Sequence, residues 1–97
     1  MLRITTEEEG DVTRFRLEGK LTGDWVRELE RCWICVKHVD PSRRFVVDLN
    51  DVSFVDAKGK VLLETMIEEH VELEADNPLM ASLASSIAGA VRATHGP

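Results

Sequence analysis

The sequence of 97 residues predicts one α/β domain with a mixed four-stranded sheet and about three helices, in the order β-β-α-β-α-β-α. Two stretches near the N-terminus alternate apolar and polar residues, as half-buried strands do. An apolar run, too short for a typical helix and rich in β-branched residues, consists of Phe45, Val46, Val47 and Leu49 and indicates a strand covered on both faces. Three longer segments place apolar residues at helical spacing, and strands that alternate with such helices predict parallel pairing with right-handed crossovers.

The first two strands are expected to form a hairpin. Residues 2–6 (LRITT) and residues 12–17 (VTRFRL) alternate in polarity, and residues 7–11 (EEEGD) supply the turn. The three glutamates of this turn have no spacing that suits metal ligation, so we expect a solvated loop. Gly19 and Gly23 then mark a second loop before the first helix.

The first helix is expected to begin near Asp24, which is a suitable N-cap, and to stop at the Asp-Pro pair of residues 40–41. Its apolar residues follow helical spacing along one stripe: Trp25, Leu29, Cys32, Trp33 and Val36. A half-buried helix that covers the sheet is therefore predicted here.

The second helix follows the central strand. Residues 52–55 (VSFV), Phe54 included, continue the apolar path of the strand, and Asp56 is expected to cap a helix over about residues 57–70. The apolar residues of this helix form two faces, so we expect it to be covered on two sides: Leu62, Leu63, Met66 and Ile67.

A short strand at residues 71–75 and a third helix complete the predicted fold. Asn77-Pro78 opens this helix, which should reach about Ala93. Its apolar stripe consists of Met80, Leu83, Ala84, Ile87 and Val91.

The third helix carries no charge between Asp76 and Arg92, and its outer positions are small: Ala81, Ser82, Ser85, Ser86 and Gly89. An ordinary exposed helix would carry several Lys or Glu residues. One interpretation is that a partner or a second copy covers this face, which predicts a homodimer through the third helix. The other is a weakly polar face in contact with solvent, and the sequence does not choose between them.

Composition and charge exclude several classes of function. The net charge of -6 argues against nonspecific binding of nucleic acid, because no segment supplies a basic face. No apolar run approaches the roughly 20 residues of a membrane helix, so no direct membrane insertion is expected. The N-terminus has no signal-peptide pattern, and we expect a cytoplasmic location of bacterial type.

Cys32 and Cys35 match the C-x-x-C pattern, but they lie in the middle of the first predicted helix. A redox pair of this kind belongs at a helix N-terminus, where amide dipoles lower the thiol pKa. A zinc site lacks a second pair of ligands, and His38 points elsewhere on the helix. We therefore expect two structural thiols in a reducing compartment, with Cys32 the more buried.

No catalytic pattern stands out. His38, His70 and His95 have no spacing that suggests a triad or a metal site, and no glycine-rich phosphate loop is present. We expect no enzyme activity, no cofactor and no metal.

The segments LEGKLTGDW (residues 17–25) and VVDLNDVSFVDAKG (residues 46–59), with this element order, resemble a STAS domain, the sulfate-transporter and anti-sigma-antagonist family, over nearly the whole of residues 1–97. The central segment is the specific part. The resemblance implies a small α/β domain that docks on partners and does not turn over substrates.

In the bacterial anti-sigma antagonists, a partner-switching kinase phosphorylates a hydroxyl residue between an Asp and a Gly. Asp56 and Gly59 match that motif, and Asp24 lies in the loop where another acidic residue often borders the docking surface. The bracketed pair is Ala57-Lys58, which cannot take a phosphate. Ser53 is expected to be a strand-end or turn hydroxyl and not a substitute acceptor.

Lys58 has two interpretations, a solvated side chain or, with Lys60, a permanently basic docking spot for an acidic partner surface. The resulting partner-binding prediction comprises Asp24, Asp56, Ala57, Lys58, Gly59 and Lys60.

Two functions fit these residues. The first is a non-catalytic interaction module like the anti-sigma-factor antagonists, with an anti-sigma factor or switch kinase as its partner but without the usual phosphorylation. The alternative is a STAS-type accessory subunit that binds the ATPase subunit of a phospholipid-trafficking ABC transporter. Binding of a small ligand or nucleotide beside Asp24 and Asp56 has less support.

Overall fold

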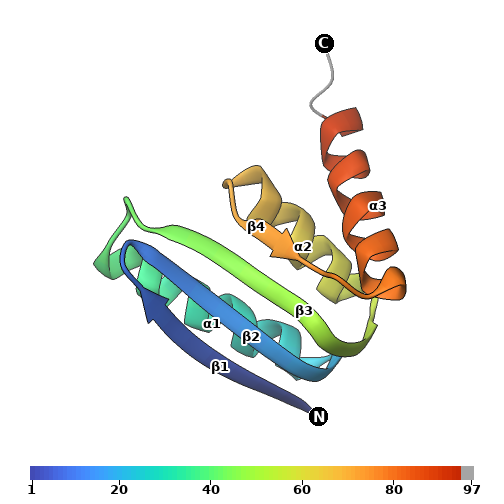
Figure 1. The fold of residues 1–97 in the computed structure, drawn as a ribbon, viewed down its shortest axis with the longest axis horizontal. Helices are drawn as coiled ribbons and strands as arrows, with labels where there is room; N and C mark the ends of the chain where they lie inside the picture. The colour runs from blue at the N-terminus through green and yellow to red at the C-terminus, as the bar shows by residue number, and fades with distance from the viewer. Residues whose placement is uncertain (95–97) are drawn as a thin grey trace.

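Strands and helices follow one another in the predicted order β-β-α-β-α-β-α over residues 1–94, the part of the chain that the computed structural model describes (Figure 1). The elements are β1 (Leu2–Glu9), β2 (Val12–Leu21), α1 (Asp24–Val39), β3 (Arg44–Val55), α2 (Ala57–Glu68), β4 (Glu72–Glu74) and α3 (Pro78–Thr94). The α/β class, the mixed four-stranded sheet and the three predicted helices are confirmed. His95 lies outside the described residues.

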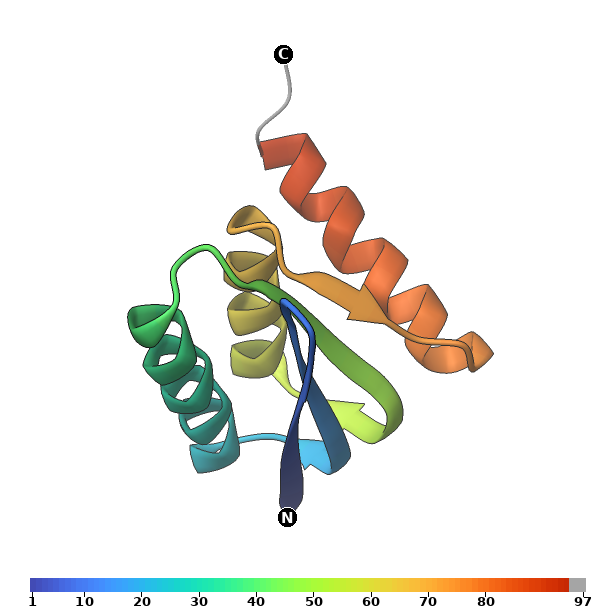
Figure 2. The same cartoon turned by 60° about the vertical axis from the view of Figure 1, so that its left-hand side comes forward.

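The sheet has the strand order β1-β2-β3-β4. β1 and β2 pair antiparallel, whereas β2 with β3 and β3 with β4 pair parallel. α1 and α2 make the two connections between parallel strands and lie together behind the sheet in Figure 1. α3 stands beside α2 at the β4 edge, as Figure 2 shows from another side.

The core lies between the sheet and the helices. Phe15 of β2 and Phe45 of β3 stack with ring centroids 6.0 Å apart. Side chains of the helices close this layer: Leu29 and Trp33 of α1, Leu62, Leu63 and Met66 of α2, and Met80 and Ile87 of α3. Burial of these apolar side chains is the main term that stabilises the fold.

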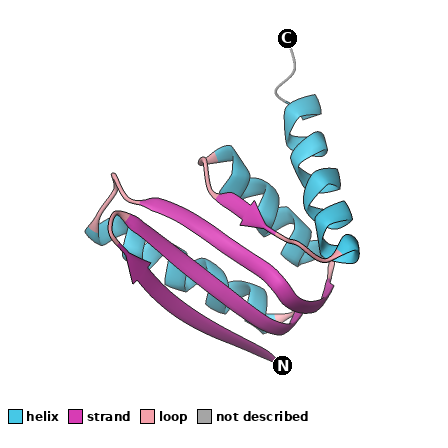
Figure 3. Cartoon of the chain, viewed as in Figure 1, coloured by secondary structure: helices cyan, strands magenta, loops and turns pink. Residues whose placement is uncertain are grey.

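The other face of the sheet carries ion pairs between strands. Arg14 of β2 pairs with Glu74 of β4 at 2.7 Å, and Arg44 of β3 pairs with Glu72 at 3.0 Å. Along β2, Phe15 and Leu17 are buried, whereas Arg14 and Arg16 alternate with them and belong to the other face. Figure 3 shows the four strands side by side with α1 and α2 behind them. In residues 1–94, none of the helices has the length and apolar content needed to cross a membrane.

The hairpin turn is shorter than predicted, so the predicted extent of residues 7–11 is wrong. β1 continues to Glu9, and the three glutamates pair with β2 in the register Glu7↔Arg14 to Glu9↔Val12. Only Gly10 and Asp11 form the turn, and Gly19 lies inside β2 instead of in a loop. Pairing with β2 holds the three glutamates in a strand, which their own propensity would not predict.

β3 is one strand, and not a strand followed by a separate apolar segment. Its pairing with β2 shifts twice, and the second shift falls where Gly19 pairs with Val52 but Lys20 pairs with Phe54. Ser53 is the extra residue of this bulge, which breaks the alternation of faces. Phe54 is therefore exposed, contrary to the prediction that it continues the apolar path, while Val55 returns to the core.

α2 ends in a Schellman motif. Val71 N–H donates to the Met66 carbonyl at 3.0 Å and His70 N–H donates to the Ile67 carbonyl at 2.9 Å, with His70 at a left-handed φ of 69°. This motif turns the chain into β4, which is shorter than the predicted strand of residues 71–75.

α3 begins where predicted. The Asn77 side chain accepts from Met80 N–H at 2.8 Å and donates to the Asn50 carbonyl of β3 at 3.0 Å. One residue thus caps the helix and fixes its start against the central strand.

Candidate functional site

Asp56 joins three segments at the end of the central strand. Its N–H donates to the Leu21 carbonyl at the end of β2, at 3.2 Å. One carboxylate oxygen, Oδ1, accepts from Gly59 N–H at 2.8 Å, and the other, Oδ2, accepts from Gly23 N–H at 2.9 Å. The predicted helix cap is confirmed, and the same carboxylate also holds the loop before α1.

These contacts favour the charged carboxylate. The hydrogen bond from the Gly23 amide, followed by that from the Gly59 amide, lowers the pKa of Asp56 below its ordinary value, and the Lys58 charge lowers it further. Asp56 therefore stays ionised at neutral pH with both oxygens already engaged, and its main effect is to hold the turn in shape.

Gly59 is buried, and its lack of a side chain lets α2 approach the sheet. A Cβ atom there would lie 2.7 Å from Val55 Cγ1 and 2.9 Å from the Leu21 carbonyl oxygen. Gly59 therefore shapes the turn and presents almost no surface of its own.

Asp24 is not the N-cap of α1, which corrects the prediction. Gly23 occupies that position at a φ of 55°, with no side-chain cap, and Asp24 is the first helical residue. The left-handed backbone of Gly23 is one that a side chain would strain, and its N–H is the one that reaches Asp56.

The remaining predicted residues form the exposed outer side of the turn: Ala57, Lys58 and Lys60. Lys58 and Asp24, which lie far apart in sequence, line one polar hollow of about 200 Å³ together with Arg27 and Glu30 of α1. The site thus brings Asp24, Asp56 and Lys58 together around the loop at Gly23.

Sequence reasoning missed part of this surface. Phe54 is 54% exposed and Val61 is 60% exposed, on either side of the turn. Arg27 and Glu30 were also missed, although their place on the polar face of a helix that starts beside Gly23 was a usable signal. We call residues 54–61 the docking turn.

The two cysteines are free, and Cys32 is the more buried, as predicted. Burial, with a smaller contribution from Glu28, raises the pKa of the Cys32 thiol, which keeps it protonated and a poor nucleophile. No group of three or more potential metal ligands occurs among residues 1–94.

Comparisons with known proteins bear on the fold. No family model matches the sequence, and the search of curated proteins likewise gives no match. A solved structure described as an uncharacterized protein of the DUF3478 family, with a SpoIIAA-like fold, from Shewanella loihica PV-4 superposes with a TM-score of 0.57 at 15% identity, over 81% of this chain and 71% of that one. A structure described as Mglu superposes with a TM-score of 0.59 at 20% identity, over 76% of this chain but only 19% of that one.

The chain has a SpoIIAA-like, that is STAS-like, fold. At these identities the similarity concerns the fold alone. Any role of the docking turn must therefore be argued from its own residues.

Proposed function

We propose that this chain is a non-catalytic protein-interaction module, like the anti-sigma-factor antagonists, which docks a partner through the docking turn without phosphorylation at the usual position. The observation that carries the proposal is the Asp56 carboxylate, which clamps the turn between Gly23 and Gly59 and leaves Ala57 and Lys58 outermost. Ala57 has no oxygen that could accept a phosphate. The SpoIIAA-like fold supports this class of module.

The chemistry of the turn indicates the kind of partner. Two exposed apolar side chains, Phe54 and Val61, lie in the same segment as two exposed lysines, Lys58 and Lys60. Buried aromatic anchors within a rim of charge are typical of protein interfaces. We infer that the partner presents an acidic surface with an apolar pocket.

Affinity capture from the native cell tests this proposal. The baits are the wild-type chain, the turn variant Lys58→Glu/Lys60→Glu, and the control variant Arg3→Glu/Arg92→Glu, which makes the same charge change at exposed residues elsewhere. We expect one partner that the control retains and the turn variant loses. A partner retained equally by all three baits would contradict docking through this turn.

A second measurement tests the absence of a phosphate switch. The purified partner is titrated with the chain, with and without MgATP, and the chain is then examined by intact-mass spectrometry. We expect the same Kd in both conditions and an unmodified mass. A phosphate on Ser53 that abolishes binding would show that the switch had moved.

The nature of the captured protein distinguishes the two candidate functions. A switch kinase or anti-sigma factor supports the antagonist-like role, and the ATPase subunit of an ABC transporter supports the accessory-subunit role. The lack of a hydroxyl at residues 57–58 is compatible with both.

A further inference from the structure

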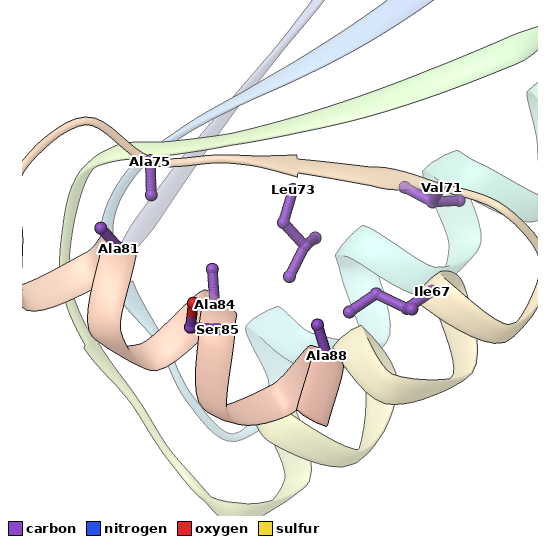
Figure 4. A pocket seen from close by; sticks show the side chains of 8 residues that line it. All are labelled: Ile67, Val71, Leu73, Ala75, Ala81, Ala84, Ser85 and Ala88. Carbon is purple, nitrogen blue, oxygen red and sulfur yellow. The ribbon is translucent and has the colours of Figure 1, made fainter. Parts of the chain in front are cut away.

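A groove of about 420 Å³ opens between β4 and α3, at the end of the molecule where α2 stops. Figure 4 shows Leu73 and Ala75 on the strand side and Ala84 and Ala88 of α3 directed into the same space. The lining is apolar and mostly small. Leu73 and Ala75 are alternate residues of one extended segment, so they present one face of the strand to the groove.

β4 is also an edge of the sheet. It pairs only with β3 within residues 1–94, so its other side has no strand beside it. Natural edge strands are usually protected by a short length, charged side chains, Pro, a bulge or a covering element. β4 has three residues, Glu-Leu-Glu, and α3 stands beside it with the groove between them. Both charged side chains of β4 are acidic, so they repel an acidic strand but not a basic one.

The stretch of sequence that lines the groove carries charge of one sign. Residues 61–91 contain six Asp and Glu residues and no Lys or Arg, so this stretch accounts for the whole net charge of -6. Glu72 and Glu74 pair with Arg44 and Arg14 from the β3 side. Carboxylates have several acceptor sites each, so they can also accept from a cation on the open side.

We propose that the β4–α3 groove is a second docking surface, which takes an extended segment of a partner protein as an added strand beside β4. Side chains of such a segment alternate between faces. Apolar residues at every second position enter the groove beside Leu73 and Ala84, and basic residues at the positions between them lie beside Glu72 and Glu74.

A second copy of this chain fits the groove less well. Pairing of two β4 edges would bring Glu72 and Glu74 of one copy against those of the other, and like charges on opposite strands are destabilising. Each copy would also bring its own six acidic residues from residues 61–91. A basic segment has no such repulsion.

Binding of synthetic peptides tests the proposal. The probe is a fluorescent peptide of about nine residues that alternates Lys and Val, and the matched peptides alternate Glu with Val or Lys with Ser. We expect the Lys-Val peptide to bind at least about tenfold more tightly than either matched peptide. The Glu-Val peptide is also tested on the turn variant Lys58→Glu/Lys60→Glu, whose docking turn is no longer basic. Equal binding of the Glu-Val and Lys-Val peptides to that variant would overturn the proposed charge recognition, and no binding of Lys-Val would overturn the site.

Variants of the chain locate the binding. Ala84→Phe fills the groove and is expected to weaken Lys-Val binding about tenfold, whereas Ser82→Phe, on the same helix but outside the groove, is expected to leave it unchanged. The turn variant Lys58→Glu/Lys60→Glu should also bind normally, which separates this site from the docking turn. Circular dichroism confirms that each variant is folded.

Strand addition has its own readout. The bound peptide should slow amide hydrogen exchange across residues 72–75 in the wild-type chain. Binding without that protection would overturn the added strand. A dimer in sedimentation that Ala84→Phe dissolves, and that excludes the peptide, would make a second copy the occupant instead.

Discussion

α2 begins at one candidate surface and ends at the other, and the two surfaces are built in opposite ways. At its start, the Asp56 carboxylate accepts from the amides of Gly23 and Gly59, and the proposed docking turn presents exposed side chains. At its end, the chain passes His70 into the short edge strand β4, which offers backbone groups and an apolar groove. The first surface thus consists mainly of side chains, whereas the second also offers the edge of a strand.

The two surfaces also differ in charge. Residues 61–91 carry six acidic groups and no basic ones, so the rest of the chain is balanced. The docking turn itself contains two lysines and Asp56, whose carboxylate is occupied by amides. A small domain with two such surfaces can select two partners of different charge.

The largest expected effect comes from adding a methyl group at a glycine of α2, compared with the same change in α3. Gly59→Ala places a Cβ within 2.7 Å of Val55, and we expect a loss of about 1–3 kcal/mol in the free energy of unfolding. Gly89→Ala in α3 has open space for its Cβ, and we expect a gain of about 0.5–1 kcal/mol from helix propensity. Urea unfolding measures both variants. Equal effects would contradict the close contact of α2 with the sheet.

The two helix caps should respond differently to pH. Asn77→Ala is expected to cost about 1 kcal/mol at every pH, because Asn77 is neutral. Asp56→Asn removes a charge whose pKa is lowered in the folded state, first by Gly23 and then by Gly59. Its stabilising effect is full above the ordinary carboxyl pKa of about 3.9 and is lost as the pH falls through the lowered value.

Thermal unfolding of both cap variants from neutral to acid pH checks this prediction. The difference between Asp56→Asn and the wild-type chain should be largest at neutral pH and should vanish in acid. A difference that persists in acid would show that Asp56 does not act through its charge.

The smallest expected effect is at the end of α2. His70 has a left-handed backbone, which costs about 1–2 kcal/mol for a residue with a side chain. Glycine avoids this cost but loses about 0.5–1 kcal/mol of chain entropy, so His70→Gly should stabilise by about 0.5 kcal/mol. His38→Gly, inside α1, should destabilise. Chemical unfolding measures the free energy of unfolding of both variants. A lower free energy for His70→Gly than for the wild-type chain would contradict the Schellman motif.

Local patterns were sufficient to predict the type and order of the elements, although not the bounds of the strands. Apolar spacing predicted the helices, and the Asp-x-x-Gly segment predicted the cap by Asp56, since both depend on residues close in sequence. The bond from Gly23 to Asp56 was not predictable in this way, because it joins loops 33 residues apart. The exposure of Phe54 depends on a bulge between two strands, which no single strand reveals.

The groove was the least predictable feature. The absence of charge in α3 indicated an unusual face, but the sequence did not decide whether a partner or solvent covers it. It needed the placement of α3 beside β4 to show that Leu73 and Ala84 border one space. The acidic bias of residues 61–91, by contrast, was readable from the sequence and became informative only next to that space.

The separation of the two surfaces is tested most directly by one ¹H–¹⁵N NMR titration series of the labelled chain. The Lys-Val peptide should shift amide resonances of residues 71–88 and leave residues 54–61 unchanged. The Glu-Val peptide should shift residues 54–61 and leave the β4–α3 groove unchanged. Shifts from both peptides in the same residues, or none in either segment, would contradict two docking surfaces of opposite preference.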